Sequence, residues 1–256
     1  MASITGDGGN NSFIAGTPGY VDGADTVSGN GGNDTIYSGS SSDLVFGGAD
    51  NDLIDGGGSG DILYGDAGND TVYGGSGGST DFLYGGTGND LLYGQGGGDS
   101  VYGGDNNDTL FGGSGSDRLD GGNDFDFVSY SNVTADMTVN LASGSATGDG
   151  TDSLVGIEGV IGGSGDDSIA GSTGDNWLIG GGGADTIDGG GGADTIEGGL
   201  DGDSLIGGAG TDVLSYANSA SAVNANLLSG SSTGEGTDTI SGFENQIGRA
   251  SCRERG

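Results

Sequence analysis

Large apolar residues recur along the chain with a period of nine. From Gly29 to Ser129, eleven consecutive units each place one large apolar residue at the eighth position. One of these units, Gly74–Tyr84, is eleven residues long, and the others are nine. A second run of six units covers Gly162–Ser215, and a weaker unit covers Tyr20–Ser28. Self-similarity at a fixed short period predicts a solenoid of stacked repeats.

Each unit divides into a polar, glycine-rich stretch of six residues and a strand of three. Glycine at positions 1, 2 and 4 permits positive φ angles, so these positions predict a tight turn. In the strand, position 8 faces one side and positions 7 and 9 face the other, because successive side chains alternate. Two units would form one coil, and position-8 residues such as Ile36, Val45 and Ile54 would meet between two parallel sheets. The expected fold class is all-β.

Position 6 is the most constant polar position. It is Asp in every unit of the first block, and in the second block only Asn176 breaks the column. The candidate ligands in this column are Asp25, Asp34, Asp43, Asp52, Asp61, Asp70, Asp81, Asp90, Asp99, Asp108, Asp117, Asp126, Asp167, Asp185, Asp194, Asp203 and Asp212. Taken alone, such aspartates are also consistent with a turn-capping role.

The unit pattern G-G-x-G-x-D-x-U-x, where U is a large apolar residue, resembles the RTX family of calcium-binding nonapeptide repeats. The resemblance covers about two-thirds of the chain. It implies a right-handed parallel β-roll, or β-solenoid, with two roll blocks joined by longer coils. It also implies Ca²⁺ ions between turns stacked on one edge, held by position-6 carboxylates and turn carbonyls, which are the hard oxygens that calcium prefers.

Two units separate the aspartates of each implied pair. One edge of the first block offers Asp34/Asp52, Asp52/Asp70, Asp70/Asp90, Asp90/Asp108 and Asp108/Asp126, and the other offers Asp43/Asp61, Asp61/Asp81, Asp81/Asp99 and Asp99/Asp117. The second block offers Asp167/Asp185, Asp185/Asp203 and Asp194/Asp212. Serines replace turn glycines at Ser38 and Ser40–Ser42, and Ser79 and Thr80 lengthen one turn. We expect the sites beside those turns to be the weakest.

Composition fits a calcium-filled chain and excludes most other chemistry. Glycine accounts for 66 of 256 residues, and 38 acidic residues face 4 basic ones, which gives a formal net charge of −34. A dozen or more Ca²⁺ ions would supply on the order of +24 and offset most of that charge. The sequence contains no His or Lys, which excludes a Ser-His-Asp triad, a Schiff-base lysine and a histidine-ligated zinc site. So acidic a chain is not expected to bind nucleic acid.

Two joining segments interrupt the nonapeptide pattern and repeat each other. Residues 126–162 and 212–248 align without gaps, which defines a larger repeat of 86 residues. Alternating apolar residues in Met137–Leu141 predict a strand, and we expect these segments to be longer coils of the same solenoid. Glu158 and Glu244 are either further ligands or solvated acidic residues, and we favour the second interpretation.

The predicted organisation has six parts. Residues 1–28 form degenerate repeats or a cap, 29–129 the first roll block, 130–161 a joining segment, 162–215 the second roll block, 216–246 a second joining segment, and 247–256 a tail. The tail holds the only cysteine, Cys252, and resembles the translation of a DNA-sequencing adapter. We therefore expect no thiol chemistry. No run of 18 apolar residues and no leader peptide is visible, so no membrane span is expected.

Aromatic residues at position 9 should point away from the core. The pattern predicts one ladder of Phe46, Tyr64, Tyr84 and Tyr102 and another of Tyr73, Tyr93 and Phe111. Such ladders either stabilise their own strands or contact a glycan or another sheet. We favour the stabilising role and a monomer.

The resemblance implies a calcium-binding repeat module of a secreted, extracellular or cell-surface bacterial protein, which passes a type I secretion channel and folds on Ca²⁺ outside the cell. Alternatives are a non-catalytic appendage of a secreted protease, lipase or alginate epimerase, and an adhesin or ice-binding solenoid. Ice binding would need a regular row of Thr and Asn, and only Thr87-Gly88-Asn89 fits in the first block. No catalytic constellation is visible, so we expect these residues not to form an enzyme.

Overall fold

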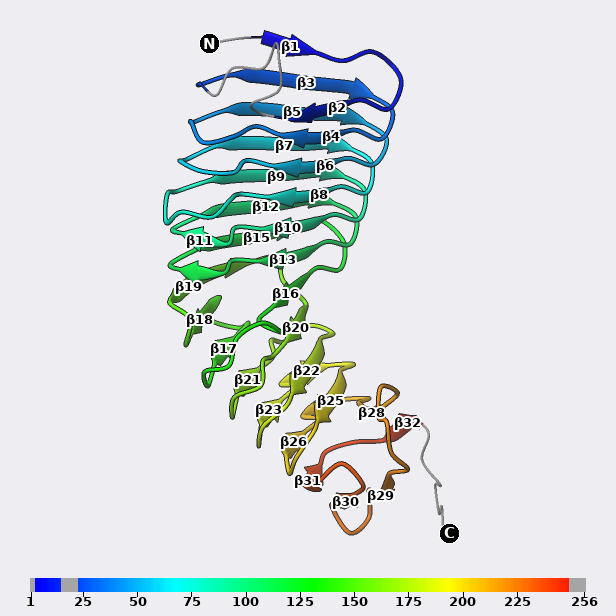
Figure 1. Cartoon of the computed structure of the whole chain (residues 1–256). Coiled ribbons are helices and arrows are strands. Elements are labelled where there is room, and N and C mark those ends of the chain that lie inside the picture. The colour runs from blue at the N-terminus through cyan, green and yellow to red at the C-terminus, as the bar shows by residue number, and fades with distance from the viewer. Residues whose placement is uncertain (1–2, 15–22, 249–256) are drawn as a thin grey trace. The chain divides into compact units, whose positions relative to one another are not determined.

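The computed structural model describes residues 3–14 and 23–248, and every structural statement below concerns those residues. All of their regular elements are β-strands. The strands stack as successive coils of a parallel β-solenoid (Figure 1), which confirms the predicted fold class. The predicted tail from residue 249 onward and residues 15–22 lie outside the described part. No helix long and apolar enough to cross a membrane occurs among the described residues.

The chain divides into two compact units, Met1–Val128 with Gly150–Ile157, and Ser129–Asp149 with Glu158–Gly256. In the first unit, one sheet has the order β1 (Ser3–Thr5), β3 (Thr26–Gly31), β5 (Leu44–Ala49), β7 (Ile62–Ala67), β9 (Phe82–Thr87), β12 (Ser100–Asp105), β15 (Arg118–Gly122) and β19 (Thr151–Val155). The facing sheet has β2 (Ser12–Ile14), β4 (Thr35–Tyr37), β6 (Leu53–Asp55), β8 (Thr71–Tyr73), β10 (Leu91–Tyr93), β13 (Thr109–Phe111) and β16 (Phe127–Ser129). Two turn strands, β11 (Gly96–Gly97) and β14 (Ser114–Gly115), pair with each other.

The second unit repeats this arrangement. One sheet contains β17 (Thr138–Asn140), β18 (Ser145–Thr147), β21 (Ser168–Ala170), β23 (Thr186–Asp188), β26 (Ser204–Ile206), β31 (Thr237–Ser241), β30 (Ser231–Thr233) and β29 (Asn224–Asn226). The other contains β20 (Gly159–Ile161), β22 (Trp177–Gly181), β25 (Thr195–Gly199), β28 (Val213–Tyr216) and β32 (Asn245–Gly248). Turn strands β24 (Gly191–Gly192) and β27 (Ala209–Gly210) pair as β11 and β14 do.

The core consists of two rows of position-8 side chains, one from each sheet. In the first unit, Val45 pairs in register with Leu63 and Leu63 with Leu83, while Ile36 pairs with Ile54 on the facing sheet. All five are fully buried. This confirms the predicted core. Because each nine-residue unit contributes only one such side chain, the apolar core is thin.

Turn glycines serve two different purposes. Positions 2 and 4 have positive φ, as at Gly86 (117°) and Gly88 (122°), and Asp50 (73°) adopts the same conformation where glycine is absent. Position-1 glycines such as Gly94 are not among the positive-φ residues, so the prediction was wrong for that position. Gly94 is required instead by close approach, because a Cβ there would lie 2.5 Å from the carbonyl oxygen of Gly112.

The joining segments add antiparallel strands to the parallel stack. β18 runs antiparallel to β17, and β30 runs antiparallel to both β29 and β31. In the β17–β18 turn, Asn140 Oδ1 accepts the Ser143 N–H at 2.8 Å and Gly144 has a φ of 65°. These residues reverse the chain, which simple longer coils would not do. The strand expected at Met137–Leu141 is present as β17.

Candidate metal sites

The seventeen predicted ligand aspartates are all buried, with at most 4% of each residue exposed. Each follows a glycine-rich turn and immediately precedes or begins the strand that carries the core residue two positions later. The turn geometry and the core anchor therefore fix where the carboxylate lies. Carboxylates are almost never this buried unless a partner offsets the loss of hydration.

Hydrogen bonds join these aspartates into ladders along the turn edges. Oδ1 of Asp70 accepts the N–H of Asp52 at 2.7 Å, Asp90 does the same for Asp70 at 2.8 Å, and Asp108 for Asp90 at 2.8 Å. Together with the aspartates that continue these contacts, the first unit has two ladders, Asp34–Asp52–Asp70–Asp90–Asp108–Asp126 and Asp25–Asp43–Asp61–Asp81–Asp99–Asp117. The second unit has Asp167–Asp185–Asp203 and Asn176–Asp194–Asp212. Residues 18 or 20 apart are thus brought together.

The two oxygens of a ladder carboxylate differ in their hydrogen bonds. Oδ2 is buried and has no hydrogen-bond donor in Asp34, Asp52, Asp61, Asp70, Asp90, Asp99, Asp108, Asp185, Asp194, Asp203 and Asp212. Leaving a buried acceptor unsatisfied costs about 1–3 kcal/mol, and more when it is charged. One such atom would be a local fault, but a repeated row of them indicates that a ligand outside the chain is expected there.

Position-1 glycines bring a backbone oxygen to the same space. A Cβ on Gly94 would lie 2.7 Å from Oδ2 of Asp99 and 2.5 Å from the carbonyl oxygen of Gly112, one coil further on. A carboxylate oxygen and a carbonyl oxygen therefore converge where only glycine leaves room. These are the oxygen donors that Ca²⁺ takes in flexible coordination shells. The donor set fits calcium.

The electrostatics of the ladders oppose ionisation without a cation. Burial, with the neighbouring ladder carboxylates adding to it, raises the pKa of Asp61 and Asp108 to about 8 and that of Asp52 and Asp99 to about 7. In Asp185 the same two causes raise the pKa to about 8. The backbone hydrogen bond to Oδ1 lowers the pKa in each case, but less than burial raises it. A divalent cation would offset this cost directly.

Two positions in the second unit already have protein donors. Oδ2 of Asp167 accepts the N–H of Gly163 at 2.8 Å. The amide of Asn176 accepts the N–H of Ser172 at 2.7 Å and donates to the carbonyl of Glu158 at 3.1 Å. Among the predicted ligands, Asp167 is therefore the one whose Oδ2 is shown satisfied by the backbone.

The two irregular turns in the first unit keep the ladder but alter its surroundings. Ser38 occupies position 1, where it is buried and its hydroxyl donates to the carbonyl oxygen of Gly56 at 2.9 Å. The side chain thus engages a backbone oxygen of the kind that faces the carboxylates in regular turns. In the lengthened turn, Asp81 still accepts the N–H of Asp61 at 2.7 Å.

Three acidic residues of the joining segments extend the ladders beyond the predicted set. Asp152 Oδ1 accepts the N–H of Asp117 at 3.0 Å, Asp238 Oδ1 that of Asp203 at 3.2 Å, and Glu244 Oε2 that of Asp212 at 2.8 Å. The Asp-x-Leu and Asp-x-Ile patterns at Asp152 and Asp238 were the available sequence signal. Glu244 is exposed, as expected for a solvated residue, and its carboxylate also continues a ladder.

Candidate sites combine few carboxylates with backbone oxygens. No group of three or more Asp, Glu, His or Cys residues that could hold a metal ion occurs in the described part of the chain.

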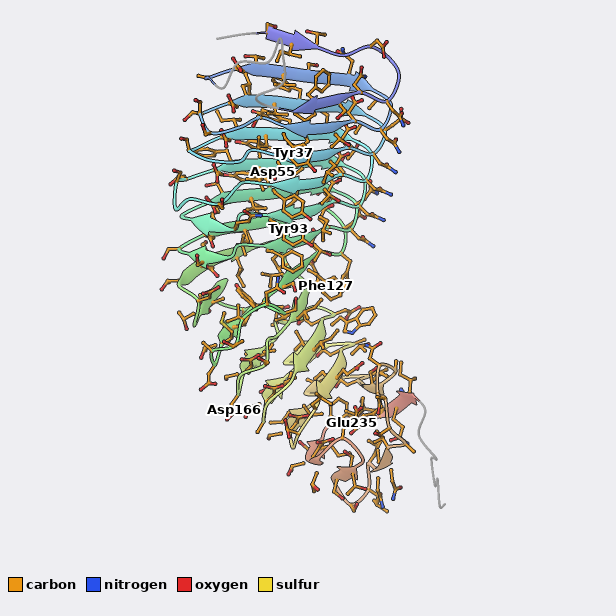
Figure 2. All side chains as sticks on the ribbon, in the orientation of Figure 1. Tyr37, Asp55, Tyr93, Phe127, Asp166 and Glu235 are labelled. Carbon is orange, nitrogen blue, oxygen red and sulfur yellow. The ribbon has the colours of Figure 1, made fainter. Side chains whose placement is uncertain are left out.

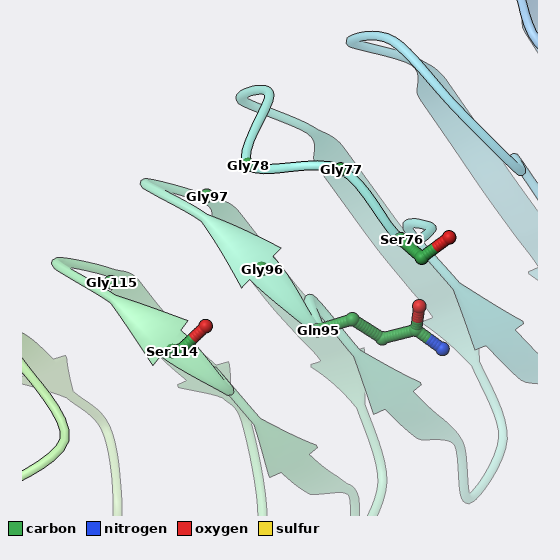
Figure 3. A pocket seen from close by; sticks show the side chains of 8 residues that line it. All are labelled: Ser76, Gly77, Gly78, Gln95, Gly96, Gly97, Ser114 and Gly115. Carbon is green, nitrogen blue, oxygen red and sulfur yellow. The ribbon is translucent and has the colours of Figure 1, made fainter.

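A shallow depression on one turn edge is lined by Ser76, Gly77, Gly78, Gln95, Gly96, Gly97, Ser114 and Gly115 (Figure 3). Its glycine floor and polar rim offer no acid–base or nucleophile–base pair, because none of its lining residues is titratable in the neutral range.

Comparison with known families bears directly on this geometry. A family profile described as four copies of the RTX calcium-binding nonapeptide repeat matches residues 21–54, 46–80, 55–92, 77–110, 93–128, 161–196 and 188–218. The chain belongs to the RTX family. This confirms the resemblance drawn from the nonapeptide pattern, and the RTX repeat is a structural calcium-binding module rather than a catalytic one. No curated protein matches the chain.

The aromatic residues of the RTX roll form the two predicted ladders on its outer faces. Ring centroids are 5.1 Å apart for Phe46 and Tyr64, 4.7 Å for Tyr64 and Tyr84, and 5.0 Å for Tyr84 and Tyr102, with planes within 9°. The shorter ladder, which includes the Tyr93 labelled in Figure 2, has spacings of 4.7 and 4.4 Å. At one end of the longer ladder, the Arg118 guanidinium lies 5.8 Å from the Tyr102 ring and pairs with Asp120 at 2.6 Å.

Proposed function

We propose that this chain is a calcium-dependent folding module of a secreted bacterial protein, which stays open where calcium is scarce and folds outside the cell. The observation that carries the proposal is the repeated buried Oδ2 without a donor, facing a carbonyl oxygen of the next coil. Extracellular calcium modules bind at about 10⁻⁴–10⁻³ M, a range matched to the outside of a cell. The roll blocks 29–129 and 162–215 would be the calcium-binding parts.

The proposed ligands are the ladder aspartates and the turn carbonyls that face them. One ion between each adjacent pair of coils on an edge gives on the order of a dozen ions, which would offset most of the formal charge of −34. Bound calcium would supply positive charge to carboxylate oxygens that burial removes from water. The chain's own residues do the rest: position-1 glycines leave room, and the core rows hold the turns at one coil spacing.

The stacked rings support a stabilising role for the aromatic ladders and a monomeric module. Glycan stacking needs an open ring face, whereas neighbouring rings 4.4–5.1 Å apart cover one another's faces. Offset stacking between adjacent strands contributes about 0.5–1.5 kcal/mol per pair beyond buried area.

Titration with calcium, using magnesium as the matched control, tests the proposal. We expect the far-ultraviolet circular dichroism of metal-stripped protein to change from disordered to strand-rich with calcium. Magnesium should not produce this change, because it demands a smaller, near-octahedral shell and gives up its water reluctantly. A strand-rich spectrum in excess chelator at about pH 8, where the ladder carboxylates are ionised, or an equal response to magnesium, would contradict the proposal.

A further inference from the structure

The last ladder position of the second unit, Asp238 on β31, is satisfied by hydroxyl groups. Its Oδ1 accepts the N–H of Asp203 at 3.2 Å, as elsewhere in the ladders. Its Oδ2 accepts the phenol O–H of Tyr216 at 3.1 Å and also the hydroxyl of Ser232. Asp238, Tyr216 and Ser232 are 6%, 4% and 1% exposed. Both carboxylate oxygens thus have donors from the chain itself.

The carbonyl oxygen that approaches the position-1 glycine in regular coils is not among the three nearest atoms at this position. On the preceding coil of the same unit, a Cβ on Gly180 would lie 2.5 Å from the carbonyl oxygen of Gly198. At Gly198 itself, the three atoms nearest to a Cβ all belong to Asp203. The difference arises because the next coil is the antiparallel β30–β31 pair and not a glycine turn, as Figure 1 shows beside β26. The Asp203–Asp238 space therefore lacks a close carbonyl oxygen, and the Oδ2 of Asp238 is already satisfied, so the one unpartnered oxygen there is the Oδ2 of Asp203.

We infer that Asp238 ends the calcium ladder: the Tyr216 and Ser232 hydroxyls take the place of the metal, and the joining segment closes the block without binding an ion. This inference rests on the proposed function, since it divides the same ladder into positions that use calcium and one that does not. The two buried hydroxyls join Asp238 on β31 to Tyr216 on β28 and to Ser232 on β30 by hydrogen bonds whose strength does not depend on the calcium concentration.

Two of the three residues in this hydrogen-bonded group recur in the larger repeat of 86 residues. At the offset of 86 residues, Tyr216 corresponds to Tyr130 and Asp238 to Asp152, while Ser232 corresponds to Ala146. The tyrosine and the carboxylate thus recur in sequence, and the serine does not.

Counting bound ions in two matched variants tests the inference. Wild type, Asp203→Asn and Asp238→Asn are equilibrated with saturating calcium, and bound calcium per chain is measured by equilibrium dialysis and elemental analysis. We expect Asp203→Asn to lose at least one ion and Asp238→Asn to lose none, because the two hydroxyls can rotate to accept from an amide. Equal losses in the two variants would overturn the inference.

A second variant decides the matter if Asp238→Asn fails to fold. Tyr216→Phe keeps the carboxylate but removes one of its donors, so we expect a lower unfolding temperature in saturating calcium with an unchanged ion count. Tyr84→Phe, on the outer sheet face, is the control and should leave both unchanged. If calcium were the partner of Asp238, Tyr216→Phe would leave the unfolding temperature as in wild type. Wild type that binds no calcium would refute the proposed function itself, before any variant is compared.

Discussion

A single added methyl group at a position-1 glycine should remove one or two of the proposed calcium ions. Gly94→Ala is the sharpest case, because Gly94 is buried and its φ is not positive, so backbone strain does not complicate the result. The new Cβ would lie 2.5 Å from the Gly112 carbonyl oxygen and 2.7 Å from Asp99 Oδ2. Gly77→Ala is the matched control on the same turn edge, since a Cβ there has no atom within 4 Å.

The magnitude follows from two costs that add. Forcing a methyl group into a packed space typically costs about 1–3 kcal/mol. The methyl also displaces the two oxygens that would face calcium, and Asp99 contacts ladder neighbours on both sides, Asp81 and Asp117. At ten times Kd, each lost ion removes about 1.4 kcal/mol, so two lost ions remove about 3 kcal/mol. The control should be neutral, or more stable by about 0.4–1 kcal/mol through the unfolded chain.

The assay is urea unfolding at fixed free calcium, with bound ions counted in parallel. We expect Gly94→Ala to bind one or two fewer ions and to unfold at clearly lower urea, while Gly77→Ala matches wild type in ion count. If both variants bind the wild-type number of ions with the same midpoint, the space beside Gly94 is not where calcium is held. The proposed donor set would then be wrong.

Three further predictions use other parts of the roll. In metal-free buffer the strand signal should be larger at pH 5 than at pH 8. The folded-state pKa values of about 7 for Asp99 and about 8 for Asp61 lie above the ordinary 3.8, so the folded state loses stability as the pH rises from 3.8 through these values. A signal independent of pH would contradict this. Asp90→Ala should lower bound calcium by one or two ions, whereas Asp105→Ala, outside the ladder, should lower it much less; equal losses would refute the register. Replacing Tyr64, Tyr84 and Tyr102 by Thr should leave the calcium-bound chain monomeric in sedimentation velocity with modestly reduced stability, and a wild-type dimer that this variant abolishes would show an interface.

The core and the aspartate ladders could be predicted from sequence because period and alternation determine them. Once position 8 faces inward, as Leu63 and Leu83 do, the turn residues of successive coils must stack at one coil spacing. Asp70 and Asp90 then meet even though they lie 20 residues apart across the lengthened turn. Nothing beyond the repeat and the pleat is needed for these contacts.

The joining segments could not be predicted in the same way, since their contacts depend on single residues. Asn140 and Gly144 reverse the chain into an antiparallel strand, and neither belongs to a repeated pattern within the segment. The hydroxyl donors of Asp238 come from Tyr216 and Ser232, which lie 22 and 6 residues away. The role of the position-1 glycine could not be predicted either. A positive φ and a close approach of another atom both require glycine, so the sequence does not tell these two reasons apart.

The unpartnered carboxylate oxygens arise from the backbone geometry as much as from the acidic composition. Each turn uses the N–H of one ladder aspartate to satisfy a single oxygen of the next, as Asp81 does for Asp99, and the second oxygen of Asp99 then has no donor. Asp167 differs, because its Oδ2 accepts the N–H of Gly163. Hydroxyl side chains solve this once, at Asp238, where the chain leaves the nonapeptide pattern and has room for a tyrosine. Within the pattern, glycine at position 1 excludes any such side chain, and Ser38 shows what happens otherwise: its hydroxyl donates to the facing carbonyl of Gly56. Under the proposed function, a nine-residue unit that keeps its glycine and has an unpartnered Oδ2, such as that of Asp99, takes its last ligand from solution.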